Sequence, residues 1–245
     1  MDRKNIPDPG FADDDGTADP ALAAALADWA RDPAAAEPAL LAALRPARLM
    51  VPIVALLGEV TTDANGLKHE KTSDMAVPVI EAADGRRALP AFTSLASLAA
   101  WQADARPAPV SAPQAVMTAY GERADTLLID PAGPVTYQLT GARMRAVAEN
   151  RVWLPPTRDP DVLAALRTLL AVEPQVLRAE LRPGDGTDAV LALGLADGAQ
   201  VAELAQRLAG ALAGDPTLRV RLASGLDLAL LPPGAPAGEC FYRRG

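Results

Sequence analysis

The sequence has very few of the residues that most often bind metals, form disulfides or attack substrates. It holds one cysteine, Cys240, and one histidine, His69, among 245 residues. A zinc site made of several His or Cys ligands cannot be built from that pair, and neither can a disulfide within the chain. A Ser-His-Asp triad would have to use His69, which lies in a polar stretch expected to be a loop. We therefore expect no metal and no cofactor, and we assign no catalytic residue.

Excess positive charge and long apolar segments are also missing. Acidic residues outnumber basic ones by 31 to 23, the formal net charge is −8 and the sequence pI is near 4.7, which argues against nucleic acid as a partner. The longest apolar run, residues 49–57, is about half of the ~20 residues that a membrane-spanning helix needs. The first residues lack the apolar stretch of a secretory signal. We expect a soluble cytoplasmic protein that does not bind membranes.

The acidic charge is concentrated at the start of the chain. Residues 1–40 hold nine acidic and three basic side chains. Residues 1–18, which include the run Asp13-Asp14-Asp15-Gly16, contain few apolar side chains and are predicted to be a disordered acidic tail. Its deletion is expected to leave the melting temperature nearly unchanged. Asp19-Pro20 then predicts a helix start, with an acceptor at the N-cap and proline in the first helical position.

Residues 19–152 are predicted to form a first domain of alternating helices and strands. The sequence Asp84-Gly85 indicates a hairpin between two of the strands, and the proline-rich residues 104–113 are predicted to be a connector. Periodicity and end signals predict helices from residue 19, from near residue 38, and over 95–101, 114–120 and 141–150, and strands over 48–57, 75–82, 86–92, 126–129 and 135–139.

Pro155-Pro156 marks the expected boundary to a second domain, residues 157–233. Its element order is α-β-β-α-β-β, which predicts a small antiparallel sheet with helices on one face. The helices are expected over 161–172 and 198–213, and the strands over 175–182, 189–195, 218–222 and 226–231. Residues 234–245 are predicted to be a loosely held tail. The fold class is thus α/β (α+β), with mixed to antiparallel sheets in two small domains behind an N-terminal helical arm.

Several short segments occur in a specific order and spacing: Arg48–Pro52, Thr72–Ala76, Asp84–Ser94, Trp101 and Leu128–Pro134. In this order they resemble the N-terminal domain of the SseB family, the bacterial family named for enhanced serine sensitivity. The resemblance covers residues 40–148, and residues 159–232 are similar to the C-terminal domain that accompanies it. The resemblance implies a mixed α/β fold. It implies no reaction, since the family has no agreed catalytic residues to carry over.

Four charged residues of the first domain are candidates for ligand or partner binding. Asp74 stands at the mouth of a strand, where a carboxylate would suit a partner or a proton transfer, or would simply end the strand. Arg86 and Arg87 follow the hairpin and should point to opposite sheet faces. One would pair with Asp74 or Asp130 and the other would meet an anionic ligand, or both would be solvated. Asp130 leaves the end of a buried strand, a frequent ligand position in parallel α/β sheets, although an ordinary turn explains it too.

Two further candidates, Thr93 and Trp101, flank one predicted helix. The Thr93 or Ser94 hydroxyl would either polarise a substrate or cap the helix by accepting a backbone N–H. Trp101, at the other end of that helix, would be a recognition hot spot or a core residue. The thiol of Cys240 has no resolving partner within the chain and is expected to be incidental.

These residues support three hypotheses about function. The first is a non-enzymatic binding or adaptor protein with a protein partner, whose capture Arg86→Glu or Trp101→Ala would weaken. The second is an enzyme or small-molecule sensor that gathers Asp74, Arg86, Arg87 and Asp130 around one pocket. The third is a homo-oligomer in which edge strands of the hairpins pair.

Overall fold

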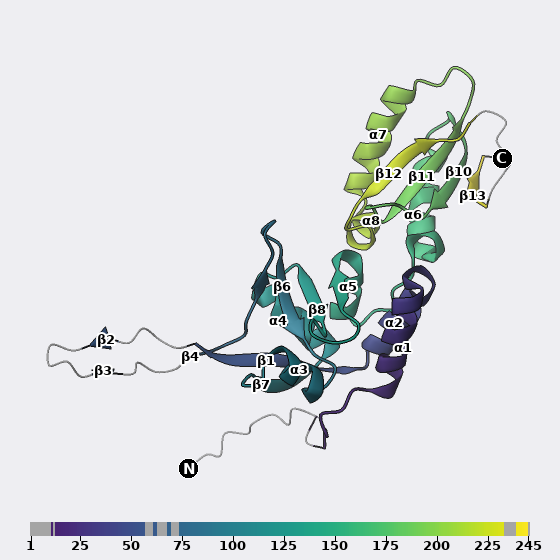
Figure 1. Cartoon of the computed structure of the whole chain (residues 1–245). Helices are drawn as coiled ribbons and strands as arrows, with labels where there is room; N and C mark the ends of the chain where they lie inside the picture. The colour runs from purple at the N-terminus through teal and green to yellow at the C-terminus, as the bar shows by residue number, and fades with distance from the viewer. Residues whose placement is uncertain are drawn as a thin grey trace, which may run out of the picture. The chain divides into compact units, whose positions relative to one another are not determined.

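The computed structural model describes residue 11 and residues 13–56, 61–62, 68–69, 74–232 and 239–244. It divides into two compact units, residues 1–153 and 154–245 (Figure 1). Both units combine helices with mixed or antiparallel sheets, so the predicted α/β class is confirmed.

The N-terminal unit begins with two helices, α1 (Pro20–Arg31) and α2 (Pro33–Leu44), which pack against each other. The carboxylates of Asp19 and Asp32 accept backbone N–H groups at the two helix starts, and each is followed by proline. Helix α2 therefore begins before Pro38, the expected start, because Asp32-Pro33 repeats the signal of Asp19-Pro20. Pro38 lies inside the helix.

Two sheets follow in the same unit. In the first, β6 (Arg87–Ala91) and β8 (Thr126–Ile129) pair in parallel, with β5 (Ile80–Glu81) and β9 (Tyr137–Thr140) added antiparallel at the edges. The second is antiparallel, with the order β4 (Asp74–Ala76), β1 (Arg48–Leu56) and β7 (Arg106–Ser111). Met50 of β1 and Phe92 after β6 exchange backbone hydrogen bonds of 2.7 and 2.9 Å, which join the sheets. The short strands β2 (Thr61–Thr62) and β3 (Lys68–His69) pair with each other.

Strand β7 replaces the connector predicted for residues 104–113. The backbone N–H and C=O groups of Met50 bond to Phe92, on the side of β1 away from β7. The backbone groups of its neighbours Leu49 and Val51 therefore point to β7, where they lie opposite Val110 and Ala108. Pro107 and Pro109 alternate with these residues, so their missing N–H groups lie on the outer edge, where no ladder hydrogen bond is lost. The prolines thus mark an edge strand here.

Three further helices complete the N-terminal unit: α3 (Leu95–Trp101), α4 (Ala112–Gly121) and α5 (Gly141–Ala148). Ser94 caps α3 by accepting from the Ser97 N–H at 3.0 Å. The main core joins α1, α2, α4 and α5 to the strands, with fully buried Leu22, Leu40, Leu44, Leu49, Leu89, Val116, Leu127, Ile129 and Leu139.

The C-terminal unit is a four-stranded sheet with helices on one face. The strand order is β12 (Leu226–Leu230), β11 (Ala189–Leu195), β10 (Val176–Arg182) and β13 (Cys240–Arg243). A 3-10 turn (Pro156–Arg158) leads into α6 (Pro160–Ala171), and α7 (Val201–Gly214) and α8 (Pro216–Arg221) connect β11 to β12. One cluster joins the helices to alternate strand residues: Val162, Leu166, Leu170, Val176, Ala179, Leu191, Leu193, Leu204, Leu208, Leu218 and Leu222.

Three features of this unit differ from the sequence-based expectation. Residues 216–221 form α8, although residues 218–222 were predicted to be a strand, because Asp215-Pro216 is another Asp-Pro helix start. Strand β12 pairs parallel to β11, so the sheet is mixed. The predicted tail 234–245 contains β13, which pairs antiparallel with β10.

Candidate functional site

The structure brings together two of the predicted site residues, Thr93 and Asp130. They follow the parallel strands β6 and β8, whose carboxyl ends are adjacent. The Asp130 carboxylate accepts the Thr93 N–H at 2.9 Å and the Thr93 hydroxyl at 2.6 Å. Both residues are buried, and the Asp130 backbone is left-handed, with φ 49°. The carboxylate therefore holds two strand ends together.

Arg48 extends this contact to the start of the chain. Its guanidinium donates to the Thr93 carbonyl oxygen at 2.8 Å, to the Thr17 carbonyl oxygen at 2.8 Å and to Asp14 Oδ1 at 2.7 Å. The Arg48 and Asp14 side chains are 12% and 14% exposed. Within the described residues 13–18, Asp14 and Thr17 therefore contact Arg48, contacts that a disordered tail over 1–18, as predicted, would not make. Residues 1–10 and 12 lie outside the described residues.

The predicted arginines of the hairpin do not join Asp130. Arg86 is exposed and its guanidinium donates to Asp84 at 2.7 Å, and this hydrogen bond lowers the pKa of the Asp84 carboxyl. The neighbouring Arg87 is half-buried in β6. Asp74 lies in β4 opposite Leu56, in the other sheet, and its side chain is outside the described part.

Trp101 packs in a small satellite core beneath α3. Its ring lies 5.4 Å from the Phe92 ring, centroid to centroid, at an angle of 39°. Met50 and Leu98 complete the cluster. Trp101 is half-buried, so much of its surface is used inside the fold.

A second aromatic and charged cluster, which the sequence did not reveal, fastens the helical arm. Tyr137 of β9 is 1% exposed, contacts the Trp29 ring edge-on at 5.0 Å and donates to Glu37 at 3.3 Å. Burial, followed by the charge of Glu37, raises the pKa of Tyr137 well above its usual range. Arg143 lies 2.9 Å from Glu37 and over the Trp153 ring.

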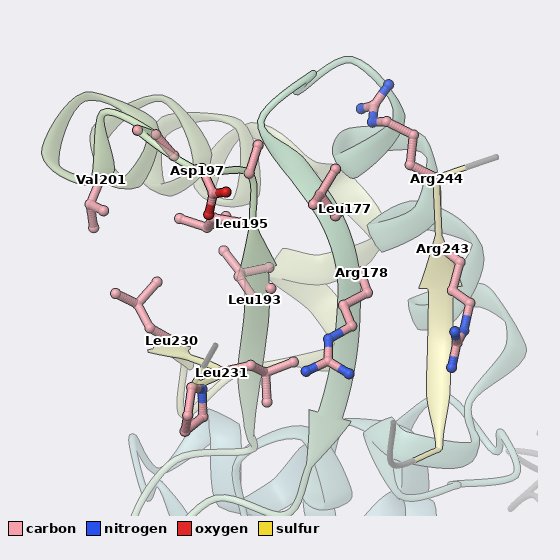
Figure 2. Close-up of a pocket in the computed structure, with 15 residues that line it drawn as sticks. Leu177, Arg178, Leu193, Leu195, Asp197, Val201, Leu230, Leu231, Arg243 and Arg244 are labelled. Atoms are coloured by element: carbon pink, nitrogen blue, oxygen red, sulfur yellow. The ribbon is translucent and has the colours of Figure 1, made fainter. Parts of the chain in front are cut away.

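The C-terminal unit contains a hollow of about 860 Å³ at one end of its sheet, which we name the C-terminal pocket (Figure 2). In the figure, leucines of β11 and β12 gather on one side of Arg178, and Arg243 of β13 lies on the other. Its lining includes Leu177, Arg178, Gly194, Val201, Leu230 and Arg243.

The apolar rim of the C-terminal pocket is open to solvent. Leu177, Val201 and Leu230 are 46%, 44% and 55% exposed. The pairing of β10 with β11 shifts register between Val176 and Arg178, so Leu177 leaves the regular alternation. Val201 is the first residue of α7.

A glycine positions the central arginine of this pocket. Arg178 and Gly194 are directly opposed on β10 and β11. A Cβ atom at Gly194 would lie 2.6 Å from Arg178 Cγ, so only glycine lets the Arg178 side chain cross so close to β11. An isolated glycine in a strand indicates such an approach, and this signal could have located the site from the sequence.

The other two arginines at the C-terminal pocket, Arg243 and Arg244, make different contacts. Arg244 donates to carbonyl oxygens at the end of α6 and after it, including Glu173 at 2.6 Å and Val176 at 3.0 Å. Arg243 is exposed on β13. Asp197 is the acidic residue of the lining. Arg244 thus secures the strand, while Arg243 presents its charge to solvent.

The described residues contain neither a membrane-spanning helix nor a cluster of metal ligands. No helix among them has the length and apolar character needed to cross a bilayer. No group of three or more His, Cys, Asp or Glu side chains in these segments is arranged as metal ligands would be. Cys240 lies near Glu180, with its sulfur 3.8 Å from Glu180 Oε1.

The family of the chain follows from its N-terminal unit. The family model of the SseB protein N-terminal domain matches residues 22–146, which confirms the resemblance and extends it back into α1. The match does not include the C-terminal unit. Comparison with curated proteins and with solved structures gives no match. Because the matched segment spans more than half of the 245 residues, the chain belongs to the SseB family.

Proposed function

We propose that this chain is a non-enzymatic binding protein of the bacterial cytoplasm, and that it docks a protein partner at the C-terminal pocket. The observation that carries the proposal is the union of exposed apolar side chains and arginines around one hollow. The occupant is an acidic, apolar segment of the partner. The C-terminal unit, residues 154–245, would be the SseB C-terminal domain that the sequence resembles.

The apolar side chains of the pocket rim are Leu177, Val201 and Leu230. Each is 44% to 55% exposed and all three line the same hollow. Covering such side chains removes apolar surface from water, which contributes about 25 cal/mol of favourable free energy per Å² buried. A partner residue of leucine or phenylalanine type would gain this contact, and exposed apolar groups around one hollow are typical of interaction sites.

The positive charge of the pocket comes from Arg178 and Arg243, of which Arg243 is exposed. Both line the pocket of a chain whose net charge is −8, so this surface opposes the overall charge. Arginine is enriched at interfaces and binds carboxylates through two parallel hydrogen bonds. An aspartate or glutamate beside the partner's apolar residues would therefore be selected, and like-charged segments would be rejected.

A peptide selection tests this proposal without knowledge of the natural partner. The full chain is immobilised and probed with a phage-displayed library of random peptides. The expected consensus places an acidic residue next to apolar ones. For a peptide of that consensus, Arg243→Glu should weaken binding about tenfold or more, the equivalent of ~1.4 kcal/mol.

The matched control is Arg106→Glu, which makes the same charge change at an exposed position of β7 in the N-terminal unit. It should leave both the consensus and the affinity unchanged. A basic or purely polar consensus would refute the proposal. So would equal losses in the two variants, or binding of small carboxylates but not of peptides, which would favour a small-molecule sensor.

A further inference from the structure

Strand β12 forms one edge of the C-terminal sheet and is regular over its whole length. It pairs with β11 without a shift, from Leu226 opposite Ala189 to Leu230 opposite Leu193. Just before β12, the Gly225 carbonyl oxygen accepts the Asp188 N–H at 3.0 Å, and just after β12 the Leu231 N–H donates to the Leu193 carbonyl oxygen at 2.8 Å. Because strand residues alternate, the backbone N–H and C=O groups of Leu226, Leu228 and Leu230 point to the open edge, where no described strand lies.

Other edges of this protein are made unsuitable for pairing. Strand β7 carries Pro107 and Pro109 on its outer side. Strand β13 carries the exposed Arg243, and its pairing with β10 shifts register between Ala179 and Glu180. Prolines, charges and irregularities are the usual protections of an edge. β12 has none of these on its leucine positions.

We propose that the edge of β12 pairs with β12 of a second copy of this chain, antiparallel and with a two-fold axis at Leu228. The sequence Leu226-Asp227-Leu228-Ala229-Leu230 is self-complementary in this register. Leu228 lies opposite Leu228 of the other copy, and Leu226 lies opposite Leu230. Each of these opposed pairs exchanges two backbone hydrogen bonds.

The side chains fit the same register on the helix face of the sheet. A hollow of about 270 Å³ lies between α7, α8 and β12, beside Leu226 and Leu228. Leu230, which is 55% exposed, would be placed opposite Leu226 of the other copy and so at the mouth of that copy's hollow. In a two-fold interface both copies use the same surface, so a side chain that projects from this surface must fit a hollow in the same surface of the other copy.

The opposite face of the strand has no charge conflict in this register. Asp227 would stand opposite Ala229 of the other copy, so like charges are not directly opposed. The Asp227 carboxylate also accepts a hydrogen bond from Thr187 at 3.1 Å within its own chain. The side chains of β12 on this face are therefore compatible with a second copy. Because Leu230 also lines the C-terminal pocket, strand pairing and partner docking would compete for this side chain.

Site-specific cross-linking of the full chain tests the register. In a Cys240→Ser background, Leu228→Cys places two thiols across the axis, where hydrogen-bonded residues have Cα atoms about 5.5 Å apart, within the range of a disulfide. Oxidised glutathione, the oxidant, should convert most of this variant to a covalent dimer. Leu230→Cys in the same background is the matched control. Its two cysteines would lie four residues out of register, about 14 Å apart, too far for a disulfide, so it should form no covalent dimer.

Equal cross-linking of the two cysteine variants, or none in either, would overturn the proposal. Sedimentation of chains without new cysteines gives a second test. The mass of the unmodified chain should rise from 25.4 kDa toward twice that value with concentration. Leu228→Lys should stay at the monomer mass, while Val172→Lys, at a 75% exposed position outside the strands, should behave as the unmodified chain. A monomer at all concentrations would also refute pairing.

Discussion

The two units of this protein use their charged and apolar side chains in opposite ways. In the N-terminal unit, Asp130 forms hydrogen bonds with Thr93, and Arg48 forms hydrogen bonds with Thr93 and with Asp14 near the start of the chain. In the C-terminal unit, Leu177 and Leu230 are about half exposed beside Arg178 and Arg243. Asp130 and Thr93 therefore contribute to the stability of the fold, whereas the surface that we propose for binding consists of leucines and arginines.

This difference follows from the free energy that each kind of side chain costs when it has no interaction partner. A buried carboxylate or guanidinium must be paired, because an unsatisfied buried polar group is strongly destabilising. A half-exposed leucine carries a smaller cost, which a partner removes on binding. Polar residues in strand-end motifs are thus poor guides to binding when the fold itself consumes their hydrogen bonds.

The largest expected effect belongs to Asp130→Ala. It leaves the buried Thr93 N–H and hydroxyl without their acceptor and puts alanine at φ 49°, so we expect a loss of about 2–4 kcal/mol in unfolding free energy. Trp29, Trp101 and Trp153 all lie in the N-terminal unit, so tryptophan fluorescence in urea reports that unit. The exposed Asp104→Ala should change stability by less than about 0.5 kcal/mol. Equal losses in both variants would contradict the structural role of Asp130.

Deletion of residues 1–18 should have the next largest effect. It removes Asp14 and the Thr17 carbonyl from Arg48, which is 12% exposed, and so leaves a mostly buried guanidinium with fewer partners. We expect a loss of about 2 kcal/mol, or a fall of ~5 °C in the melting temperature followed by fluorescence. Deletion of residues 1–10 alone retains these contacts and serves as the control. An unchanged melting temperature for the longer deletion would mean that the contacts of Arg48 contribute little.

Tyr137→Phe should have a smaller effect that depends on pH. At neutral pH the variant loses the hydrogen bond to Glu37, worth about 0.5–1.5 kcal/mol. The pKa of Tyr137 is raised in the folded chain, so above about pH 10 the unfolded phenol ionises while the folded one does not, and the original chain loses stability as pH rises. Urea unfolding at about pH 8 and about pH 11 should show the deficit of the variant shrinking. A deficit that grows with pH would contradict the raised pKa.

The smallest effect is expected for Arg86→Ala. The partner of Arg86, Asp84, is exposed as well, and exposed ion pairs contribute about 0–1 kcal/mol. Urea unfolding should be almost unchanged, and so should the affinity for a peptide selected at the C-terminal pocket. A large loss of peptide affinity would move the binding surface into the N-terminal unit.

Much of the fold could be predicted because local signals and periodicity agree. The strand predicted over residues 189–195 and the cap predicted at Ser94 correspond to β11 and α3. The errors arose where tertiary context decided. The prolines of β7 are tolerated because they face an open edge, and the parallel pairing of β12 depends on where α7 and α8 return the chain.

The candidate site was less predictable than the fold. The chemical types of Asp130 and Thr93 were evident, but whether a carboxylate faces a ligand or a neighbouring amide depends on distances of about 3 Å that a sequence does not contain. The C-terminal pocket is formed by side chains from four strands and the start of α7. Only Gly194, which stands opposite Arg178, gave a local sign of it.

The most direct test is to map the binding of a selected acidic, apolar peptide onto the backbone amides of the full chain by NMR. The account predicts that shifts concentrate in the C-terminal unit, at Leu177, Arg178, Gly194, Val201 and Arg243, and that the amides of Thr93 and Asp130 do not move. Shifts concentrated around Thr93, Asp130 and Arg86 instead would contradict it.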